Sequence, residues 1–336
     1  MRRAEIPQEL TAAKRVAVAR FLGDRRAAAH SAPWAVSAHP VRNVVGVGIG
    51  RKVTKGRLTA RLCVRLYVEH KIARAVVPRE LLLPPSIGAV ETDIVETGPL
   101  RALAASPAGR KRLRPLQPGC SIGFSFANGD SGNLMAGTLG AIVEAEGVRY
   151  LLSNNHVLAN ENRMPVGTPI FQPGLLDGGD PAGDRVATLT RFVALTAEGS
   201  NTMDCALAAV DNVNAVRATV LPRVGRLTSV DPADAALGMG VEKTGRATGY
   251  TTGTVHDVSA TVTVQFDLGR LVFEDQVLIT GDGDGRLFCD GGDSGSLVVD
   301  RQSGRATALL FGGGREFGIA NHLGDVLTHL AVALVT

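Results

Sequence analysis

Residues that could carry out nucleophilic acyl transfer lie near the C-terminal end of the chain. The segment Gly291-Gly292-Asp293-Ser294-Gly295-Ser296 places a serine hydroxyl in a glycine-rich turn. Acyl transfer by serine needs a base, a carboxylate that orients the base, and backbone N–H groups facing the oxyanion. Glycine lets the chain turn so that two such N–H groups converge. The segment therefore predicts Ser294 as the nucleophile, with the N–H groups of Gly292 and Ser294 as the oxyanion hole.

The same tetrapeptide, Gly-Asp-Ser-Gly, also occurs at residues 129–132. Turns favour these residue types, so the match alone does not identify a nucleophile. Ser131 is followed by Asn133 and precedes the candidate base described next, whereas Ser294 leads directly into an apolar strand. We interpret the first copy as a hairpin turn.

His156 is the candidate base among the seven histidines, because it follows an apolar run that ends in Ser153-Asn154-Asn155. Asp204 is the candidate orienting carboxylate. It stands immediately before the apolar run 205–210, where an unpaired carboxylate would be costly to bury. The alternatives are a structural core histidine and an aspartate that merely begins a strand at the surface.

Short β-prone runs separated by glycine and turn residues fill the chain from about residue 119 onward. Such spacing favours an all-β sandwich or a pair of barrels rather than a helical domain. A helical pattern returns only at 324–335. The expected strands include residues 141–143, 150–152, 206–210, 253–255, 261–266, 277–279, 296–299 and 306–311.

The first third of the chain has a different pattern, which predicts a helix and a small domain of mixed helix and strand. Residues 1–30 predict an N-terminal amphipathic helix, with its helical pattern at 7–28, and residues 31–100 predict a small α/β domain. Within that domain we expect a hairpin at 43–68, a short helix after Pro78 and a strand near 90–95. The proline-rich and basic segment 101–118 reads as a solvated linker to the domain at 119–336.

Charge is distributed unevenly, although the net charge is only +4. Residues 1–114 hold 22 Lys and Arg against 8 Asp and Glu, and residues 115–336 hold 14 against 24. A basic region could bind nucleic acid, anionic lipid or an acidic partner. Docking on the acidic remainder explains it with fewer assumptions. We therefore do not expect nucleic acid or a membrane as partners, and assign to this region contacts with a regulatory protein or a second copy.

The four cysteines are widely spaced and form no Cys-x-x-Cys pair, so neither a metal site nor another cofactor is expected. The chain opens without an apolar signal segment, and it contains no apolar run long enough for a transmembrane helix. These features predict a cytoplasmic protein with free thiols.

The chain order His156, Asp204, Ser294 resembles that of chymotrypsin-like enzymes. The likeness is closer to the plant narrow-leaf-type trypsin-like proteins and their bacterial relatives, and it covers nearly all of residues 40–330. It implies a double six-stranded β-barrel of chymotrypsin type, with His156 and Asp204 in the first barrel and Ser294 in the second. It also implies a serine endopeptidase that forms an acyl-enzyme intermediate. The segments that carry it are Asn43-Val44-Val45-Gly46-Val47-Gly48, Gly137-Thr138-Leu139-Gly140, Leu152-Ser153-Asn154-Asn155-His156-Val157-Leu158-Ala159, Gln172-Pro173-Gly174, Asp177-Gly178-Gly179 and Lys243-Thr244-Gly245-Arg246-Ala247-Thr248-Gly249.

The resemblance places the primary substrate pocket around residues 287–291 and 310–313, with Phe288, Leu310, Phe311 and Gly312 as its walls. Phe288 falls near the pocket floor, where trypsins keep an aspartate, which implies a preference for an apolar or small side chain. Two departures stand out. Val157 follows the histidine where secreted trypsins have a cysteine, and no Ile-Val-Gly-Gly start is present to supply an amine for Asp293.

Three other functions compete with the peptidase. A complete triad could sit on a catalytically silent or gated regulatory module. An esterase would use the same chemistry with a different leaving group. A nucleic-acid adaptor would depend on the basic first third and bind in a salt-sensitive way.

Overall fold

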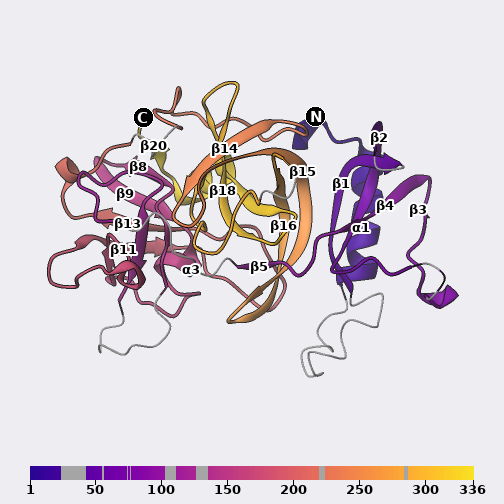
Figure 1. Cartoon of the computed structure of the whole chain (residues 1–336), viewed down its shortest axis with the longest axis horizontal. Helices are drawn as coiled ribbons and strands as arrows, with labels where there is room; N and C mark the ends of the chain where they lie inside the picture. The colour runs from indigo at the N-terminus through magenta and orange to yellow at the C-terminus, as the bar shows by residue number, and fades with distance from the viewer. Residues whose placement is uncertain are drawn as a thin grey trace.

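The computed structural model of the chain is mainly β, and its strands form two curled sheets that lie next to each other (Figure 1). This arrangement is consistent with a double β-barrel of chymotrypsin type. The structure describes residues 1–23, 43–54, 57–73, 75, 77–102, 111–125, 135–218, 224–283 and 287–336.

The first sheet follows a circuit of six strand positions. The strands pair in the order β8-β9-β13-β11-β10-β6, and β6 also pairs with the short strand β7. The chain continues from β7 directly into β8, so these two strands share one position and the circuit returns to its start. The short C-terminal strand β20 (Ala333–Leu334) pairs with β8 outside this circuit. The interior is filled by apolar side chains such as Ile122, Leu151 and Ile170. The strands are β6 (Ser121–Phe124), β7 (Gly137–Thr138), β8 (Ala141–Ala145), β9 (Val148–Ser153), β10 (Pro169–Phe171), β11 (Arg185–Phe192) and β13 (Ala206–Val210).

The second sheet also contains a closed circuit of six strands. Its order is β16-β19-β18-β17-β14-β15, and pairing of β15 with β16 completes the circuit. The short strand β12 (Ser200–Asn201) pairs with β16 outside the circuit, and helix α4 (Leu323–Leu330) follows β19. The circuit strands are β14 (Gly240–Gly245), β15 (Gly249–Phe266), β16 (Gly269–Gly281), β17 (Leu297–Asp300), β18 (Ala306–Gly313) and β19 (Gly318–His322).

The N-terminal elements extend the second sheet. Strand β1 (Val44–Thr54) pairs with β15 on one side and with β2 (Arg57–Val68) on the other, which confirms the expected hairpin. Strands β4 (Val90–Glu96) and β3 (Ser86–Ile87) follow, after the short 3-10 helix η5 (Arg79–Leu81). Because these strands continue the barrel sheet, the boundaries of a separate α/β domain stay a prediction.

Helix α1 (Gln8–Leu22) covers these N-terminal strands (Figure 1). Its buried residues include Leu10, Ala13, Ala17 and Phe21, the apolar positions whose helical spacing predicted it. The remainder of the expected helix, residues 24–28, lies outside the described residues.

Alternating glycines in β1 make room for a polar cluster beneath it. A Cβ at Gly48 would overlap the carboxylate of Asp257 on β15, and one at Gly50 would meet the Arg65 guanidinium. Asp257 accepts a hydrogen bond of 2.7 Å from the hydroxyl of Tyr67, and both residues are fully buried. Arg65 contacts the ring of His256. Gly46 and Gly48 therefore allow the backbone of β1 to approach β15 of the second barrel closely.

Of the segment predicted as a solvated linker, the structure describes residues 101–102, which form strand β5 (Arg101–Ala102), and residues 111–118, which pack on the first barrel. Leu116 is 1% exposed and forms a bridge with Val216. Arg112 donates to Asp184 at 2.6 Å, and Arg114 lies 3.5 Å from the same carboxylate. The expected solvated linker is wrong for these residues, because an apolar side chain and an acidic partner hold them against the barrel.

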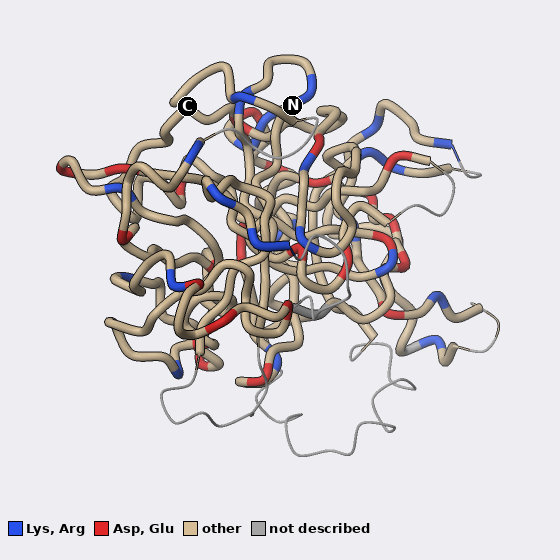
Figure 2. The backbone as a smooth tube through the Cα atoms, turned by 60° about the vertical axis from the view of Figure 1, so that its left-hand side comes forward, with Lys and Arg blue, Asp and Glu red and all other residues tan. Residues whose placement is uncertain are grey.

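The basic first third contacts acidic residues of the remainder, as the docking interpretation predicted. Arg3 lies 2.7 Å from both Asp275 and Asp325. Both signs of charge are distributed over the whole described backbone (Figure 2). These contacts account for some of the excess positive charge without an external anion.

The His256 cluster predicts a specific loss of stability in acid. Burial, and next the Arg65 guanidinium, lower the pKa of His256 to about 3. Below the unfolded-state pKa of about 6.5, the unfolded chain takes up a proton that the folded chain refuses, so stability falls as the pH falls from 6.5 toward 3. Between pH 7.5 and pH 5, His256→Gln should lose about 2 kcal/mol less free energy of unfolding than the wild type.

Urea unfolding at the two pH values measures this difference. The exposed His70 supplies the control, because His70→Gln should follow the wild-type pH dependence. Equal pH dependence of wild type and His256→Gln would contradict the prediction.

Candidate active site

His156 lies where the two sheets meet. It belongs to the short helix α3 (Asn155–Leu158), which follows directly after β9 (Figure 1). The side chain is 1% exposed. Its Nδ1 lies 2.5 Å from Oδ2 of Asp204, and its backbone N–H donates to Oδ1 at 3.3 Å. A carboxylate only accepts, so Nδ1 carries the hydrogen and Nε2 of the neutral ring is left with a lone pair.

The backbone of Asp204 is fixed by hydrogen bonds to two asparagine side chains. Its N–H donates to Oδ1 of Asn321 at 3.1 Å, and its C=O accepts from the side-chain amides of Asn154 and Asn321 at 2.8 and 3.0 Å. The carboxylate is fully buried, so pairing with His156 supplies the partner that burial requires. The sequence predicted this pair, and the structure brings the two residues together.

Ser294 lies on the turn before β17, against the first barrel. The N–H of Thr138 donates to the C=O of Ser294 at 2.8 Å. A Cβ built at Gly137 would come within 3 Å of both the C=O of Ser294 and the Val157 side chain, which adjoins His156. The turn carrying Ser294 therefore packs against the segment preceding β8 and the first turn of α3.

The glycines on either side of Ser294 have left-handed backbones. Gly292 has φ +94° and Gly295 has φ +93°. A Cβ at Gly295 would overlap the C=O of Thr138, so glycine is required there by space as well. Within the described residues, the N–H groups of Gly292 and Ser294 donate to no protein acceptor. They therefore remain free to bind an oxyanion.

The hydroxyl of Ser294 does not bond to His156 in this structure. It donates to the C=O of Phe311 on β18 at 3.2 Å. Among the described residues, Nε2 of His156 has no hydrogen-bond partner, although it is buried. The structure thus brings together two of the three predicted catalytic groups and leaves the serine hydroxyl turned to a neighbouring carbonyl.

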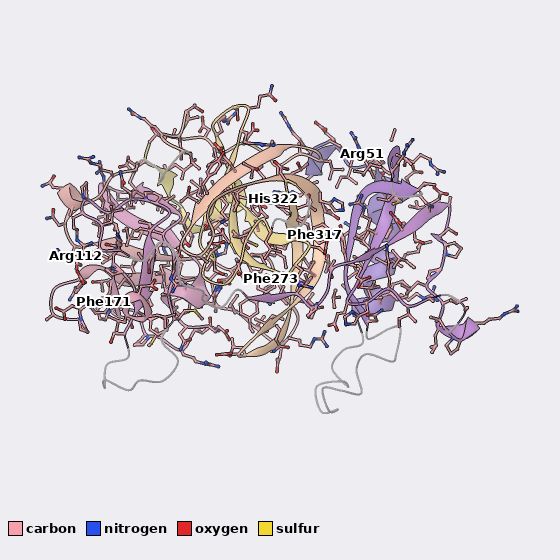
Figure 3. All side chains as sticks on the ribbon, viewed as in Figure 1. Arg51, Arg112, Phe171, Phe273, Phe317 and His322 are labelled. Carbon is pink, nitrogen blue, oxygen red and sulfur yellow. The ribbon has the colours of Figure 1, made fainter. Side chains whose placement is uncertain are left out.

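Aromatic rings surround the histidine. Phe266 meets the His156 ring edge-on, with ring centroids 5.7 Å apart. Phe273 stacks on Phe266 and contacts Phe311 at a centroid distance of 4.7 Å. Phe273 and Phe317 lie in the interior of the second sheet (Figure 3). This apolar surrounding excludes water from the His156–Asp204 pair.

Asp293 anchors the turn that carries Ser294. Lys243 donates to its carboxylate at 2.9 Å, and both side chains are fully buried. The hydroxyl of Thr248 and the N–H groups of Ala247, Thr248 and Asp290 also donate to it, at 2.6 to 3.1 Å. Lys243 thus supplies from within the chain the counter-charge that the buried Asp293 carboxylate requires. Lys243 lies in one of the segments that carry the resemblance, but the sequence did not predict a role for it.

A second buried ion pair connects the two barrels. Arg246 donates through Nε and Nη2 to the two carboxylate oxygens of Asp177, at 2.5 and 2.6 Å. The backbone N–H of Arg246 donates to the hydroxyl of Thr138, which donates to the C=O of Gly292. Sequence reasoning missed this connection, although Asp177 and Arg246 both lie in the quoted motifs.

The residues predicted to wall a substrate pocket are buried. Phe288 is 3% exposed, and its ring lies between Gly253 and Gly318. Leu310 packs in the same cluster as Phe288, whereas Phe311 packs in the aromatic cluster beside His156. Gly312 pairs with neighbouring strands. In this structure the four residues fill the interior, so their role as pocket walls stays a prediction.

Other sequence expectations concern metals, membranes, thiols and the second Gly-Asp-Ser-Gly. No group of three or more His, Cys, Asp or Glu is arranged to hold a metal in the described part of the chain. The described helices include none with the length and apolar character needed to cross a bilayer. All four cysteines are free, as predicted, and all four are buried. Ser131 lies outside the described residues.

No protein-family model matches the chain, and no curated protein matches it. Similar solved structures include a glutamic acid-specific serine protease whose report describes a histidine triad in substrate binding, with 20% identity and a TM-score of 0.45 over 66% of this chain and all of that one. Thermobifida fusca Protease A is 18% identical in sequence, with a TM-score of 0.44, over 69% of this chain and all of that chain. A Nocardiopsis protease is 15% identical in sequence, with a TM-score of 0.45, over 66% of this chain and all of that chain. Likeness at this level leaves the activity to be argued from the site itself.

Lys243→Met tests whether the buried pair holds the site together. Removal of the ammonium leaves the Asp293 carboxylate buried without a counter-charge, so the free energy of unfolding should fall by about 3–5 kcal/mol. Lys52→Met is a matched control, because Lys52 forms a surface ion pair with Glu91 at 3.3 Å and should change stability by less than about 1 kcal/mol. Urea unfolding measures both. Equal effects would show that Lys243 is not a positioning residue.

Proposed function

We propose that this chain is a serine endopeptidase with Ser294 as its nucleophile. The observation that carries the proposal is the buried His156–Asp204 pair, adjoined by a turn whose two N–H groups have no protein acceptor. Such an arrangement fits acyl transfer better than a structural role, because the large majority of buried polar side-chain atoms have a hydrogen-bond partner, and a base whose free nitrogen has none can accept a proton.

In the proposed mechanism, the Ser294 hydroxyl leaves the C=O of Phe311 and bonds to Nε2 of His156. The imidazole takes the hydroxyl proton as Oγ attacks the scissile carbonyl, and Asp204 stabilises the imidazolium. The N–H groups of Gly292 and Ser294 bind the oxyanion. His156 then returns the proton to the leaving amine, and water hydrolyses the acyl-enzyme by the reverse sequence of proton transfers.

The finer features of the peptidase are proposals as well. We retain a preference for an apolar or small side chain before the scissile bond, on the basis of Phe288 at the position where trypsins keep an aspartate. The closeness to narrow-leaf-type trypsin-like proteins and a cytoplasmic location remain predictions. Burial raises the pKa of Cys120 and Cys289 to about 12, so these thiols stay protonated and unreactive at neutral pH.

A catalytically silent or gated regulatory module is the second candidate. The observation that favours it is the Ser294 hydroxyl bonded to Phe311, with both Ser294 and His156 1% exposed. In this reading the site is closed, and a partner or a large substrate must open it.

A fluorophosphonate probe distinguishes the two candidates. A peptidase should be labelled covalently on Ser294, so Ser294→Ala should remove the label and Ser131→Ala should retain it. Asp204→Asn should slow labelling by about 10⁴-fold, because the imidazole loses the group that sets its tautomer. Intact-mass spectrometry and in-gel fluorescence measure the label. An unlabelled wild type would favour the silent or gated module, and labelling that survives Ser294→Ala would refute the proposed nucleophile.

A further inference from the structure

The segment between the N-terminal strands and the first barrel forms an additional strand on β18. Strand β5 (Arg101–Ala102) is antiparallel to β18, with Ala102 opposite Gly312 and Arg101 opposite Gly313. Just before it, the C=O of Leu100 accepts a hydrogen bond of 3.1 Å from the N–H of Gln265 on β15. The segment 97–102 therefore lies between β15 and β18 (Figure 1).

β5 occupies the same edge of β18 as the turn that carries Ser294. The opposite edge at Gly312 and Gly313 is taken by β19. On the edge that faces Ser294, β17 pairs with β18 as far as Leu309. Leu310 comes next, and it accepts a hydrogen bond from the N–H of Gly295 and donates one to the C=O of Ser296. The C=O of Phe311 then accepts from the hydroxyl of Ser294. The next two residues of that edge pair with β5.

An extended peptide that reached Ser294 along β18 would need this edge. Strand addition gives such a peptide its affinity through main-chain hydrogen bonds, which are insensitive to side-chain identity. An antiparallel strand with its C-terminal end toward Phe311 would deliver a peptide bond toward the nucleophile. β5 has that direction, because Ala102 pairs with Gly312, the residue beside Phe311.

We propose that segment 97–102 occupies the peptide-binding edge of β18 and autoinhibits the site, so that an extended polypeptide must displace it. The inference rests on the proposed function, whose substrate it identifies as an extended strand. The occupied edge also accounts for a nucleophile that is turned to Phe311 and covered.

Two anchors hold the segment in place. Leu100 is 4% exposed and packs in the aromatic cluster with Phe266 and Phe311. Thr97 donates through its N–H to the C=O of Val68, at the end of β2, at 2.8 Å. The segment is thus attached to the N-terminal strands at one end and to the active-site wall at the other. A partner that shifts the N-terminal strands would draw the segment from the edge.

The test measures strand exchange in the full-length chain without requiring catalysis. A fluorescent peptide Thr-Gly-Pro-Leu-Arg-Ala, which copies residues 97–102, is titrated against a Ser294→Ala protein with and without Leu100→Ala. Loss of the Leu100 anchor weakens the internal strand but leaves the edge intact. The peptide should therefore bind the Leu100→Ala protein at least about tenfold more tightly, which corresponds to about 1.4 kcal/mol.

Leu195→Ala is the matched control, because Leu195 is 5% exposed in the same cluster but lies outside segment 97–102. It should bind the peptide as weakly as the parent protein. Leu100→Val, a milder truncation, should give an intermediate affinity and covers the case in which Leu100→Ala does not fold. Equal affinity in all proteins would overturn the inference.

A second experiment uses proteins that retain Ser294. Cleavage of unfolded casein should rise in Leu100→Ala by a factor similar to the gain in peptide affinity, and hydrogen exchange at Gly312 and Gly313 should become faster. Faster casein cleavage in Leu195→Ala than in Leu100→Ala would overturn the inference. Tight peptide binding to a protein that never reacts with fluorophosphonate would instead refute the peptidase while retaining the strand-binding edge.

Discussion

The buried carboxylate of Asp293 is the interaction on which the candidate site depends. An isolated charge in the interior would cost several kcal/mol, and here one ammonium and four further donors offset that cost. Those donors come from Lys243, Ala247, Thr248 and Asp290, on both sides of the turn. Because the Asp293 carboxylate is bonded on several sides, the turn is held in a conformation in which the N–H groups of Gly292 and Ser294 have no acceptor among the described residues.

The loop is positioned against the first barrel by a small number of buried polar contacts. Thr138 bonds to the C=O groups of both Gly292 and Ser294, and Arg246 pairs with Asp177 across the junction. These contacts bring a serine from one barrel close to a histidine from the other. The Arg246–Asp177 pair is bidentate and fully buried, which makes its geometry specific. Among the described residues, the buried atoms near the junction without a hydrogen-bond partner are Nε2 of His156, Nη1 of Arg246 and Oδ1 of Asn154, and Nε2 of His156 is the one that the proposed chemistry requires.

The N-terminal third is built into the same sheet as the nucleophile. Alternating glycines of β1 bring its backbone close to Asp257, and segment 97–102 continues from these strands to the edge of β18. A displacement of the N-terminal strands would consequently be transmitted to the active-site wall through backbone pairing. The contacts of Arg3 with Asp275 and Asp325 attach the N-terminal end of the basic region to the second barrel.

The sequence by itself indicated the order of the strands and made His156, Asp204 and Ser294 the candidate site residues, because residue types at strand ends and in glycine-rich turns are local features. It could not determine that the Ser294 hydroxyl bonds to Phe311, nor that Phe288 packs in the interior instead of around an opening. It treated residues 101–118 as a linker, since Arg and Pro are typical of loops, whereas residues 101–102 pair with β18. Only the tertiary structure decided these points. Pairing of a short segment with a distant strand depends on which edge the folded barrel leaves open, and no local pattern carries that information.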